Sequence, residues 1–315
     1  MTRLYAGIAV LAALAACGNG SPFNGATGGD TDTGGGSTIP ESLASDLGSF
    51  TYDPAAGTLT VQGLVRDEDP FNAVFRRRPA LDRPGYVAFS AQDDPLDQHV
   101  TAYVQDIGGT RAGIAVSGGQ FTFYNAGGAY ARDGNYDPVE VQGDSGLVTY
   151  AGDYVGLTNL SGDNTDLAPI PTPGITPGVI TPGQSAVVTG QIFINVDFAD
   201  NNLSGAVYNR VLDANDAQLQ PPATTLAVGD LVFEPTTIDG NGEFFGNVEL
   251  AGDRQDRGDY GGIFGGQDAN AVAGVIFVTD HLIDSSTDEE EYGVFVLGRC
   301  GGPNQSAQIC NDVEP

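Results

Sequence analysis

Short runs of alternating hydrophobic and polar residues fill most of the chain. The clearest run lies within residues 190–211, where one face of the pattern is apolar and the other polar. The apolar face carries Ile192, Ile194, Val196 and Phe198 and, after the turn sequence Ala-Asp-Asn-Asn, Leu203, Gly205 and Val207. A period of two is the side-chain period of a β-strand, so this segment predicts two antiparallel strands joined by a tight turn.

Two further segments predict hairpins. Residues 231–250 contain two alternating runs around the sequence DGNG at 239–242, and Asp-Gly and Asn-Gly are typical hairpin turns. Residues 258–278 are apolar but contain six glycines. Each glycine would destabilise a helix by about 0.8–1 kcal/mol, so we expect strands at 260–264 and 274–279 instead. Glycine in strands marks bends and close backbone approach.

Turn-forming residues divide the runs at intervals of about eight to twelve residues, a spacing typical of an all-β sandwich or barrel. Two segments are expected to lie outside the strands. Residues 66–86, between the predicted hairpins of 48–142, read as irregular. Residues 166–183 contain Thr-Pro-Gly three times and are expected to form an exposed loop, because proline cannot donate to a β-ladder.

The N-terminus has the features of a secretory signal. A basic start with Arg3 precedes an apolar run from Leu4 to Ala16, which is too short to span a bilayer. Its end, Leu-Ala-Ala followed by Cys17, resembles the lipobox of bacterial lipoproteins. The resemblance implies cleavage before Cys17, so that residues 1–16 are removed, and lipid attachment to the Cys17 sulfur. The alternative is an ordinary signal peptide with a chance cysteine.

The residues after Cys17 are rich in Gly, Ser and Thr and nearly without apolar side chains, so residues 17–44 are expected to form a flexible, lipid-anchored tether. Gly18, rather than aspartate, follows the cysteine. In Gram-negative sorting this implies the outer membrane. We therefore expect contact with the membrane through the lipid anchor alone, with the folded body facing the periplasm or the cell surface.

The composition excludes one class of partner. The chain has 315 residues, a net charge of −29, 41 acidic residues and 12 basic residues, all of them arginine. Nucleic-acid binding needs a basic face for the phosphates, so we expect no nucleic acid partner. The acidity indicates a soluble body that repels anionic surfaces.

Two cysteines remain after Cys17 is assigned to the lipid. Cys300 and Cys310 are expected to form a disulfide in an oxidising envelope, closing the tail of residues 300–315. A metal site is the competing interpretation, but two thiols without a nearby histidine are poor zinc ligands.

No catalytic motif is present in the sequence, so we predict neither enzymatic activity nor a metal or cofactor. His99 and His281 are the only histidines, and His281 is expected to be a solvated side chain near a strand end. The sequence DGNGE at 239–243 lacks the later ligands of a calcium loop and is interpreted as a turn. The acidic run at 284–291 is interpreted as a solvated loop between strands.

One basic cluster stands out in residues 75–83. Its arginines are candidate contacts to a carboxylate or phosphate partner, because a guanidinium binds such groups bidentately. They are Arg76, Arg77, Arg78 and Arg83. The alternative, which we favour, is structural pairing with Asp67, Glu68 and Asp69.

Three segments resemble transferrin-binding protein B-like surface lipoproteins. In "GGIFGGQDANAVAGVIFV" the matching residues are Phe264, Gly266, Ala269 and Gly274, whereas Gly265, Gln267, Ala271 and Ala273 depart from the family pattern. "VTYAGDYVGL", residues 148–157, is similar to the strand that opens the family's barrel. "INVDFADNNLSGAVYN", residues 194–209, is similar to a hairpin of that barrel.

The resemblance implies an all-β fold with an eight-stranded antiparallel β-barrel at residues 143–299, preceded by a smaller, handle-like β domain at 45–142. The family's full-length proteins have two such lobes, and this chain has one. Transferrin binding and ligand residues therefore do not carry over.

Three functions remain open from the sequence. We favour a non-catalytic binding module at the outer membrane, whose loops contact an unidentified protein or nutrient-carrier partner. A lipocalin-like carrier with a small ligand inside the barrel is the first alternative, because an eight-stranded barrel is either filled or holds one small molecule. Inward-facing Phe198, Phe244 and Phe277 would favour filling. A structural envelope lipoprotein without ligand is the second alternative.

Overall fold

The computed structural model describes residues 21–23, 38–66, 69–120, 124–141, 146–170, 181–214, 225–282, 288–305 and 310. At 21–23, 65–66 and 69–72 it describes the backbone but not the side chains. Almost all regular elements are antiparallel strands, so the all-β prediction is confirmed. Within the described residues, no helix has the length and apolar character needed to cross a membrane.

The N-terminal half forms one sheet in which each strand pairs with the next along the chain. Its elements are β1 (Ser21–Phe23), α1 (Glu41–Ala44), β2 (Ser49–Asp53), β3 (Thr58–Arg66), β4 (Asp69–Arg77), η1 (Pro79–Leu81), β5 (Val87–Ala91), β6 (Val100–Ile107), β7 (Thr110–Ser117) and β8 (Ala126–Arg132). Hydrogen-bonded neighbours in sequence keep the connections short, as in a meander.

The C-terminal half forms a closed barrel. Its elements are β9 (Leu147–Ser161), β10 (Ser185–Asp197), β11 (Asn202–Asp213), β12 (Thr225–Ala227), β13 (Leu231–Thr237), β14 (Glu243–Leu250), β15 (Asp256–Gly265), η2 (Gln267–Ala269), β16 (Ala271–Thr279) and β17 (Glu290–Arg299). β9 pairs with both β10 and β17, which closes eight antiparallel strands, and β12 adds to the end of β11. The predicted eight-stranded barrel is confirmed.

The barrel interior is filled with side chains. Ile192, Ile194 and Val196 point inward from β10, as their alternation predicts, and pack with aromatic rings such as Phe233 and Phe295. Phe198 and Phe244 also lie inside. Because β-barrel strands alternate inward and outward side chains, the remaining positions form the outer wall.

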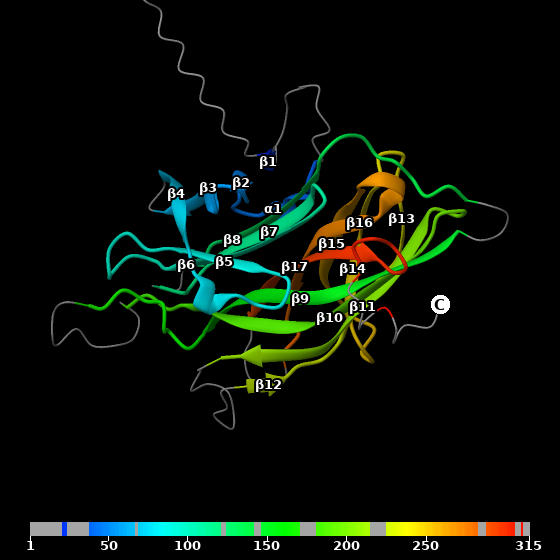
Figure 1. Ribbon diagram of the computed structural model, residues 1–315. Coiled ribbons are helices and arrows are strands. Elements are labelled where there is room, and N and C mark those ends of the chain that lie inside the picture. The colour runs from blue at the N-terminus through cyan, green and yellow to red at the C-terminus, as the bar shows by residue number, and fades with distance from the viewer. Residues whose placement is uncertain are drawn as a thin grey trace, which may run out of the picture.

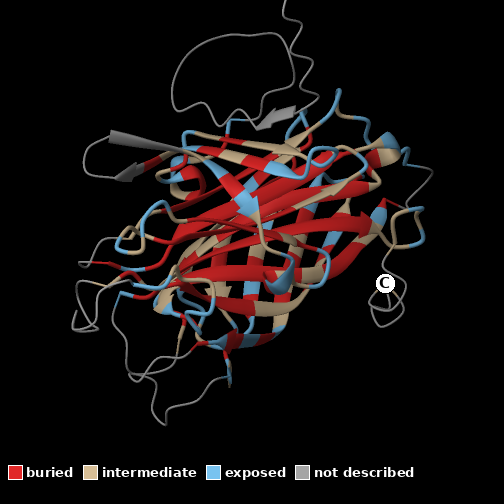
Figure 2. Ribbon diagram, turned by 60° about the vertical axis from the view of Figure 1, so that its left-hand side comes forward, coloured by how far each residue is buried: buried red, intermediate tan, exposed pale blue. Residues whose placement is uncertain are grey.

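The outer wall of the barrel is buried on one side, because the N-terminal sheet packs against it (Figure 1). Outward-facing Val155, Val275 and Val294 join a single core with residues of the N-terminal sheet such as Phe50 and Ile114. Figure 2 shows buried residues continuing through both sheets. Phe277 packs into this outer core against Tyr292, so its predicted inward orientation is wrong.

The hairpin predicted in 258–278 is confirmed as β15 and β16, which pair along their length around η2. A Cβ on Gly274 would overlap the ring of Phe295, so this glycine admits an interior aromatic side chain. The predicted turn at 239–242 is also confirmed, since the Asp239 carboxylate accepts hydrogen bonds from the backbone N–H groups of Asn241 and Glu243.

The prediction that residues 66–86 are irregular is wrong, because β4 begins within this segment at Asp69. β4 pairs with β3 after a register shift, and Pro70 lies opposite Val65. The charged and proline residues concealed the alternation of the strand, whose Phe75 is buried in the core. Proline is tolerated near a strand end or bulge, where a ladder bond is already missing.

Candidate functional site

The arginine cluster is held by the chain's own groups. Both terminal nitrogens of Arg77 donate to the Asp82 carboxylate at 2.6 Å, a bidentate pair, and Nη1 also donates to the Ala88 carbonyl. Nη1 of Arg83 donates to the backbone carbonyls of Leu81 and Asp82. These two guanidinium groups therefore order the connection between β4 and β5.

Arg78 reaches a different acid. Its Nε lies 3.1 Å from an Asp166 oxygen and 2.8 Å from Ser90 Oγ, while His99 Nε2 and Ser90 Oγ contact the other Asp166 oxygen at 3.0 and 2.6 Å. Burial raises the pKa of Asp166, but hydrogen bonds from His99 and Ser90 and the charge of Arg78 hold it below its ordinary value. Asp166 belongs to the β9–β10 connection, so this cluster ties the barrel to the N-terminal sheet.

The cluster of Ser90, His99 and Asp166 does not have the geometry of a catalytic triad. Ser90 donates its hydroxyl proton to Asp166 and thus cannot donate it to His99. A serine nucleophile needs the imidazole as its base and the carboxylate behind the imidazole. Here the carboxylate lies at the centre of the cluster, and the arrangement is that of a structural ion pair.

The sequence also named Arg76, the three acids at 67–69 and the lipidation cysteine Cys17 as functional candidates. Arg76 is exposed, and within the described part of the chain no ion pair joins it. Asp67 and Glu68 and the side chain of Asp69 lie outside the description, as does Cys17. Sequence proximity favoured those three acids, whereas the partners found are Asp82 and Asp166.

A network of charged side chains lies inside the barrel. The pattern of residues along the chain does not predict it. Arg210 Nη2 lies 2.7 Å from Glu291 Oε2, His281 Nε2 contacts the same oxygen at 2.9 Å, and Tyr154 donates to Oε1 at 2.5 Å. Arg210 also donates to the Gly229 carbonyl. The predictions of a solvated His281 and of a solvated run reaching residue 291 are therefore wrong, because both side chains are fully buried.

The electrostatics of Glu291 follow from this network. Burial alone would raise the pKa of Glu291, but Arg210 and His281, with hydrogen bonds from His281 and Tyr154, lower it to about 2. Two interior glycines make room for the network: a Cβ on Gly293 would overlap the Tyr154 hydroxyl, and one on Gly156 would crowd Glu291. The network thus links β9, β11, β17 and the β16–β17 connection.

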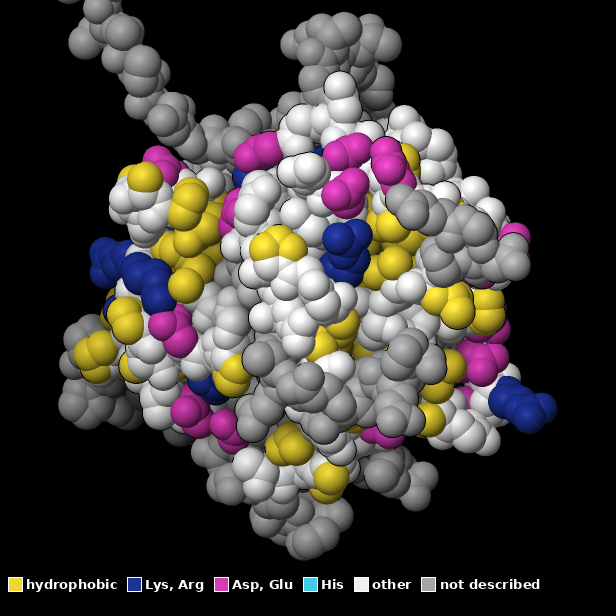
Figure 3. Space-filling view, turned by 45° about the vertical axis from the view of Figure 1, so that its right-hand side comes forward, with side chains coloured by type: hydrophobic (Ala, Val, Ile, Leu, Met, Phe, Trp, Pro, Cys, Tyr) yellow, Lys and Arg dark blue, Asp and Glu magenta, His cyan; other side chains and the backbone are white. Residues whose placement is uncertain are grey.

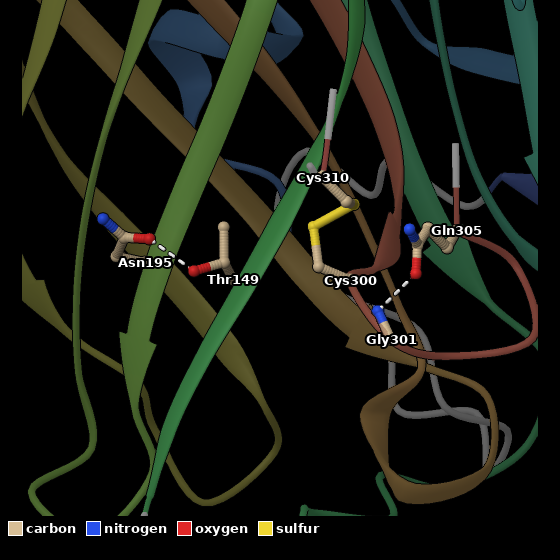
Figure 4. The surroundings of a disulfide bond; sticks show 6 residues. All are labelled: Thr149, Asn195, Cys300, Gly301, Gln305 and Cys310. Carbon is tan, nitrogen blue, oxygen red and sulfur yellow. Dashed lines mark hydrogen bonds between the residues drawn. A yellow bond between two sulfur atoms is a disulfide. The ribbon is translucent and has the colours of Figure 1, made fainter. Parts of the chain in front are cut away.

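A cleft of about 670 Å³ lies at the barrel rim beside the disulfide, and a smaller cleft adjoins it. The predicted Cys300–Cys310 bond is confirmed, and both cysteines line the cleft (Figure 4). The other lining residues are Leu147, Val148, Thr149, Asn195, Val196, Arg299 and Gly301. The smaller cleft, of about 250 Å³, continues from Leu147, Asn195 and Val196 toward Pro235.

The disulfide wall of the cleft is tied to the first barrel strand. The Cys300 backbone N–H donates to the Thr149 carbonyl at 2.8 Å, and Thr149 Oγ1 donates to Asn195 Oδ1 at 2.7 Å. Arg299 Nη1 donates to the Asp268 carbonyl at 2.9 Å. Leu147 is 71% exposed although it is a large apolar residue.

Most arginines of the described residues bond acidic side chains or backbone carbonyls of the chain itself. Besides the pairs above, Arg257 pairs with Asp253, Arg111 with Asp106 and Asp133, and Arg132 bonds backbone carbonyls. Figure 3 shows one face with hydrophobic patches, scattered acidic side chains and few arginines. Among the residues described, no group of three or more His, Cys, Asp or Glu side chains is placed to hold a metal ion.

Comparisons with known proteins found no matching family model and no matching curated protein. Similar solved structures include several of transferrin-binding protein B. The intact Ap-TbpB with its N and C lobes has 12% identity, covering 81% of this chain and 55% of that chain, with a TM-score of 0.37. A double mutant from Haemophilus parasuis has 11% identity, 80% and 54% coverage and a TM-score of 0.39.

The protein from serogroup B Neisseria meningitidis has 13% identity, covers 80% of this chain and 52% of that chain, and gives a TM-score of 0.34. This chain spans about half the length of each of these proteins. They are structures of the family that the sequence resembles, and the resemblance itself rests on the three segments quoted above. It assigns no ligand to this chain.

Proposed function

We propose that this protein is a non-catalytic binding module of the bacterial cell envelope, anchored to the outer membrane through lipid on Cys17. Its partner is a protein, or a nutrient carrier, with a basic patch. The observation that carries the proposal is the charge distribution: the described arginines mostly bond carboxylates and carbonyls of the chain itself. Twelve arginines cannot neutralise 41 acids, so most of the acidic charge is left without an arginine partner.

An uncompensated acidic surface favours a basic partner. Complementary charge steers two proteins together and raises the association rate, an effect that falls as salt increases. Loops held by a rigid β scaffold are the usual place of such contacts. The barrel and the N-terminal sheet share a core, and both therefore present fixed loops to a partner.

The packed interior supports a binding module over a carrier of small molecules inside the barrel. Tyr150, Tyr154, Tyr260, Phe264 and Phe295 are among its fully buried side chains. Both clefts described above lie at the rim. An eight-stranded barrel whose interior positions hold large side chains has no room for a ligand there.

The test is capture of partners by the soluble form, residues 38–315, from envelope extract and from candidate host and iron-carrier proteins. We expect a protein partner whose association slows severalfold between low and physiological salt. Charge-reversal variants locate the contact: Asp200→Arg lies at the barrel rim, and Asp93→Arg, its matched control, lies in the N-terminal sheet's β5–β6 loop, both at exposed positions. Retention of a small molecule alone, one per chain and without protein, would contradict the proposal.

A further inference from the structure

We infer that the rim cleft beside the Cys300–Cys310 disulfide binds an apolar organic anion, namely an alkyl chain that carries one carboxylate. This site is separate from the protein contact proposed above. The cleft has three features that support this inference: an apolar wall, a guanidinium at one end and a rigid frame. All three are formed by described residues.

The size and the wall of the cleft fit a small amphiphile. A volume of about 670 Å³ is within the usual range for small-molecule sites, roughly 300–1,000 Å³. Leu147, the half-buried Val148 and the two disulfide-bonded cysteines provide apolar surface. Leu147 is largely exposed, so a ligand that covers it removes apolar area from water.

The polar end of the cleft selects for an anion. Arg299 is the charged residue among the described lining, and no carboxylate of the described residues lines this cleft. Among the described residues, the Arg299 guanidinium has one hydrogen-bond partner, the Asp268 carbonyl, to which Nη1 donates. Its other N–H groups have no partner among the described residues, so we place a carboxylate there, the group that a guanidinium binds bidentately. A cationic ligand would be repelled by this guanidinium, and a neutral one would offer it only an uncharged acceptor.

The frame of the cleft is rigid, which lowers the entropy lost on binding. Cys300 is bonded to β9 through the Thr149 carbonyl, and the disulfide fixes Cys310 against the end of β17. Figure 4 shows Thr149 between Asn195 and the disulfide, with the Asn195 nitrogen directed away from Thr149. The alkyl chain is therefore placed along Leu147 and the disulfide, and its carboxylate at Arg299.

The experiment compares three ligands with the same alkyl chain: octanoate, 1-octanol and octylammonium. Methyl resonances of Leu147, Val148 and Val196 in the purified protein are followed during titration. We expect saturable shifts with octanoate, weaker shifts with 1-octanol and none with octylammonium. Arg299→Gln should raise the octanoate Kd about tenfold, because one charge-assisted contact is lost. Arg254→Gln, the matched control on the opposite rim, should leave it unchanged.

A second variant separates binding from folding. Leu147→Asp changes an exposed side chain and places a carboxylate beside the expected ligand, so octanoate shifts should disappear while the unfolding midpoint stays constant. Equal affinity for octanoate and 1-octanol, or octanoate binding that survives both Arg299→Gln and Leu147→Asp, would overturn the inference. Because the ligands contain no protein, this result is independent of whether a protein partner is captured.

Discussion

At the scale of single residues, the most consequential feature is the buried charge of Glu291. A carboxylate without exposure to water is destabilising unless it is paired, and here Arg210, His281 and Tyr154 all bond it. The pairing is complete for the carboxylate, whereas Arg210 Nε and His281 Nδ1 are buried with no hydrogen-bond partner among the described residues. Removing the carboxylate should therefore destabilise the fold by more than the intact ion pair stabilises it.

We expect Glu291→Gln to lower the free energy of unfolding by about 3–5 kcal/mol, because it leaves the Arg210 charge buried and unpaired. Chemical denaturation measures this change. Glu290→Gln is the matched control on the neighbouring residue: burial raises the pKa of Glu290, so neutralising it should have little effect or a stabilising one. Equal losses in the two variants would contradict the role of the network.

The same network predicts a pH dependence. The pKa of Glu291 is about 2 in the folded protein and 4.5 in its ordinary state, so the unfolded chain takes up the proton first as pH falls. The stability that the carboxylate contributes is fully present above pH 4.5 and is lost as pH falls toward 2. Between these values, unfolding free energy should fall more steeply in the wild type than in Glu291→Gln. Parallel curves would exclude this linkage.

At the scale of elements, the barrel and the N-terminal sheet are joined by buried polar contacts as well as by apolar packing. The Tyr86 hydroxyl donates to the Asp153 carbonyl of β9 and accepts from the Val296 N–H of β17. Asp166 provides a second connection through Arg78, Ser90 and His99. Specific contacts of this kind fix the position and orientation of the N-terminal sheet relative to the barrel.

Tyr86→Phe should destabilise the protein by about 1–3 kcal/mol, because it leaves the buried Val296 N–H and Asp153 carbonyl without this hydroxyl. The measurement is the denaturation midpoint, together with hydrogen exchange at Val296. Tyr136→Phe serves as the control, since Tyr136 is half-buried and contacts Arg132 through its ring. Unchanged exchange at Val296 in Tyr86→Phe would argue against this contact.

The disulfide should contribute only modestly to stability. It closes a loop with a sequence separation of 10 beyond the last barrel strand, for which the loop-entropy relation gives about 2–3 kcal/mol at most. We expect the double variant Cys300→Ser/Cys310→Ser to remain folded with a slightly lower melting temperature and to bind octanoate more weakly, as one cleft wall is released. A loss of the β-sheet circular dichroism signal would show that the barrel depends on the bond.

At the scale of the whole molecule, two sheets share one core while their surface carries a large excess of acid. The barrel is filled, so its exterior and rims are the parts available to partners. The tether expected at residues 17–44 is shorter than predicted, because Ile39, Leu43 and Ala44 are buried in the shared core and β1 pairs with β2. The part before Ile39 would keep this acidic body clear of an anionic lipid surface.

Cys17→Ser tests the anchor directly. The variant should leave the membrane fraction and become soluble, because lipid attachment requires the thiol, and stable anchoring requires buried acyl chains. Fractionation of cell envelopes with antibody detection measures the change. Ser21→Ala, a matched control in the segment that follows the cysteine, should leave the protein in the membrane fraction. Sedimentation of Cys17→Ser with the outer membrane would contradict lipidation.

The sequence by itself determined the local elements of this protein. Alternation in 190–211 fixed two strands and the inward set of Ile192, Ile194 and Val196, because the side-chain period of a strand is two. The Asp239 turn and the hairpin of 258–278 followed from residues whose backbone preferences act locally. The disulfide followed from the cysteine count and the expected compartment.

The tertiary structure alone decided which faces are buried and which charges meet. Phe277 shares its face of β16 with Ala273 and Val275, which the N-terminal sheet covers, whereas Ile276 and Val278 face the barrel interior. Apolar residues are therefore buried on both faces of the same strand. Arg210 and Glu291 are 81 residues apart, and His99 and Asp166 are 67 apart. Periodicity assigns a side chain to a face but carries no information on contacts between distant segments, and these pairs exist only once the barrel closes and the second sheet docks.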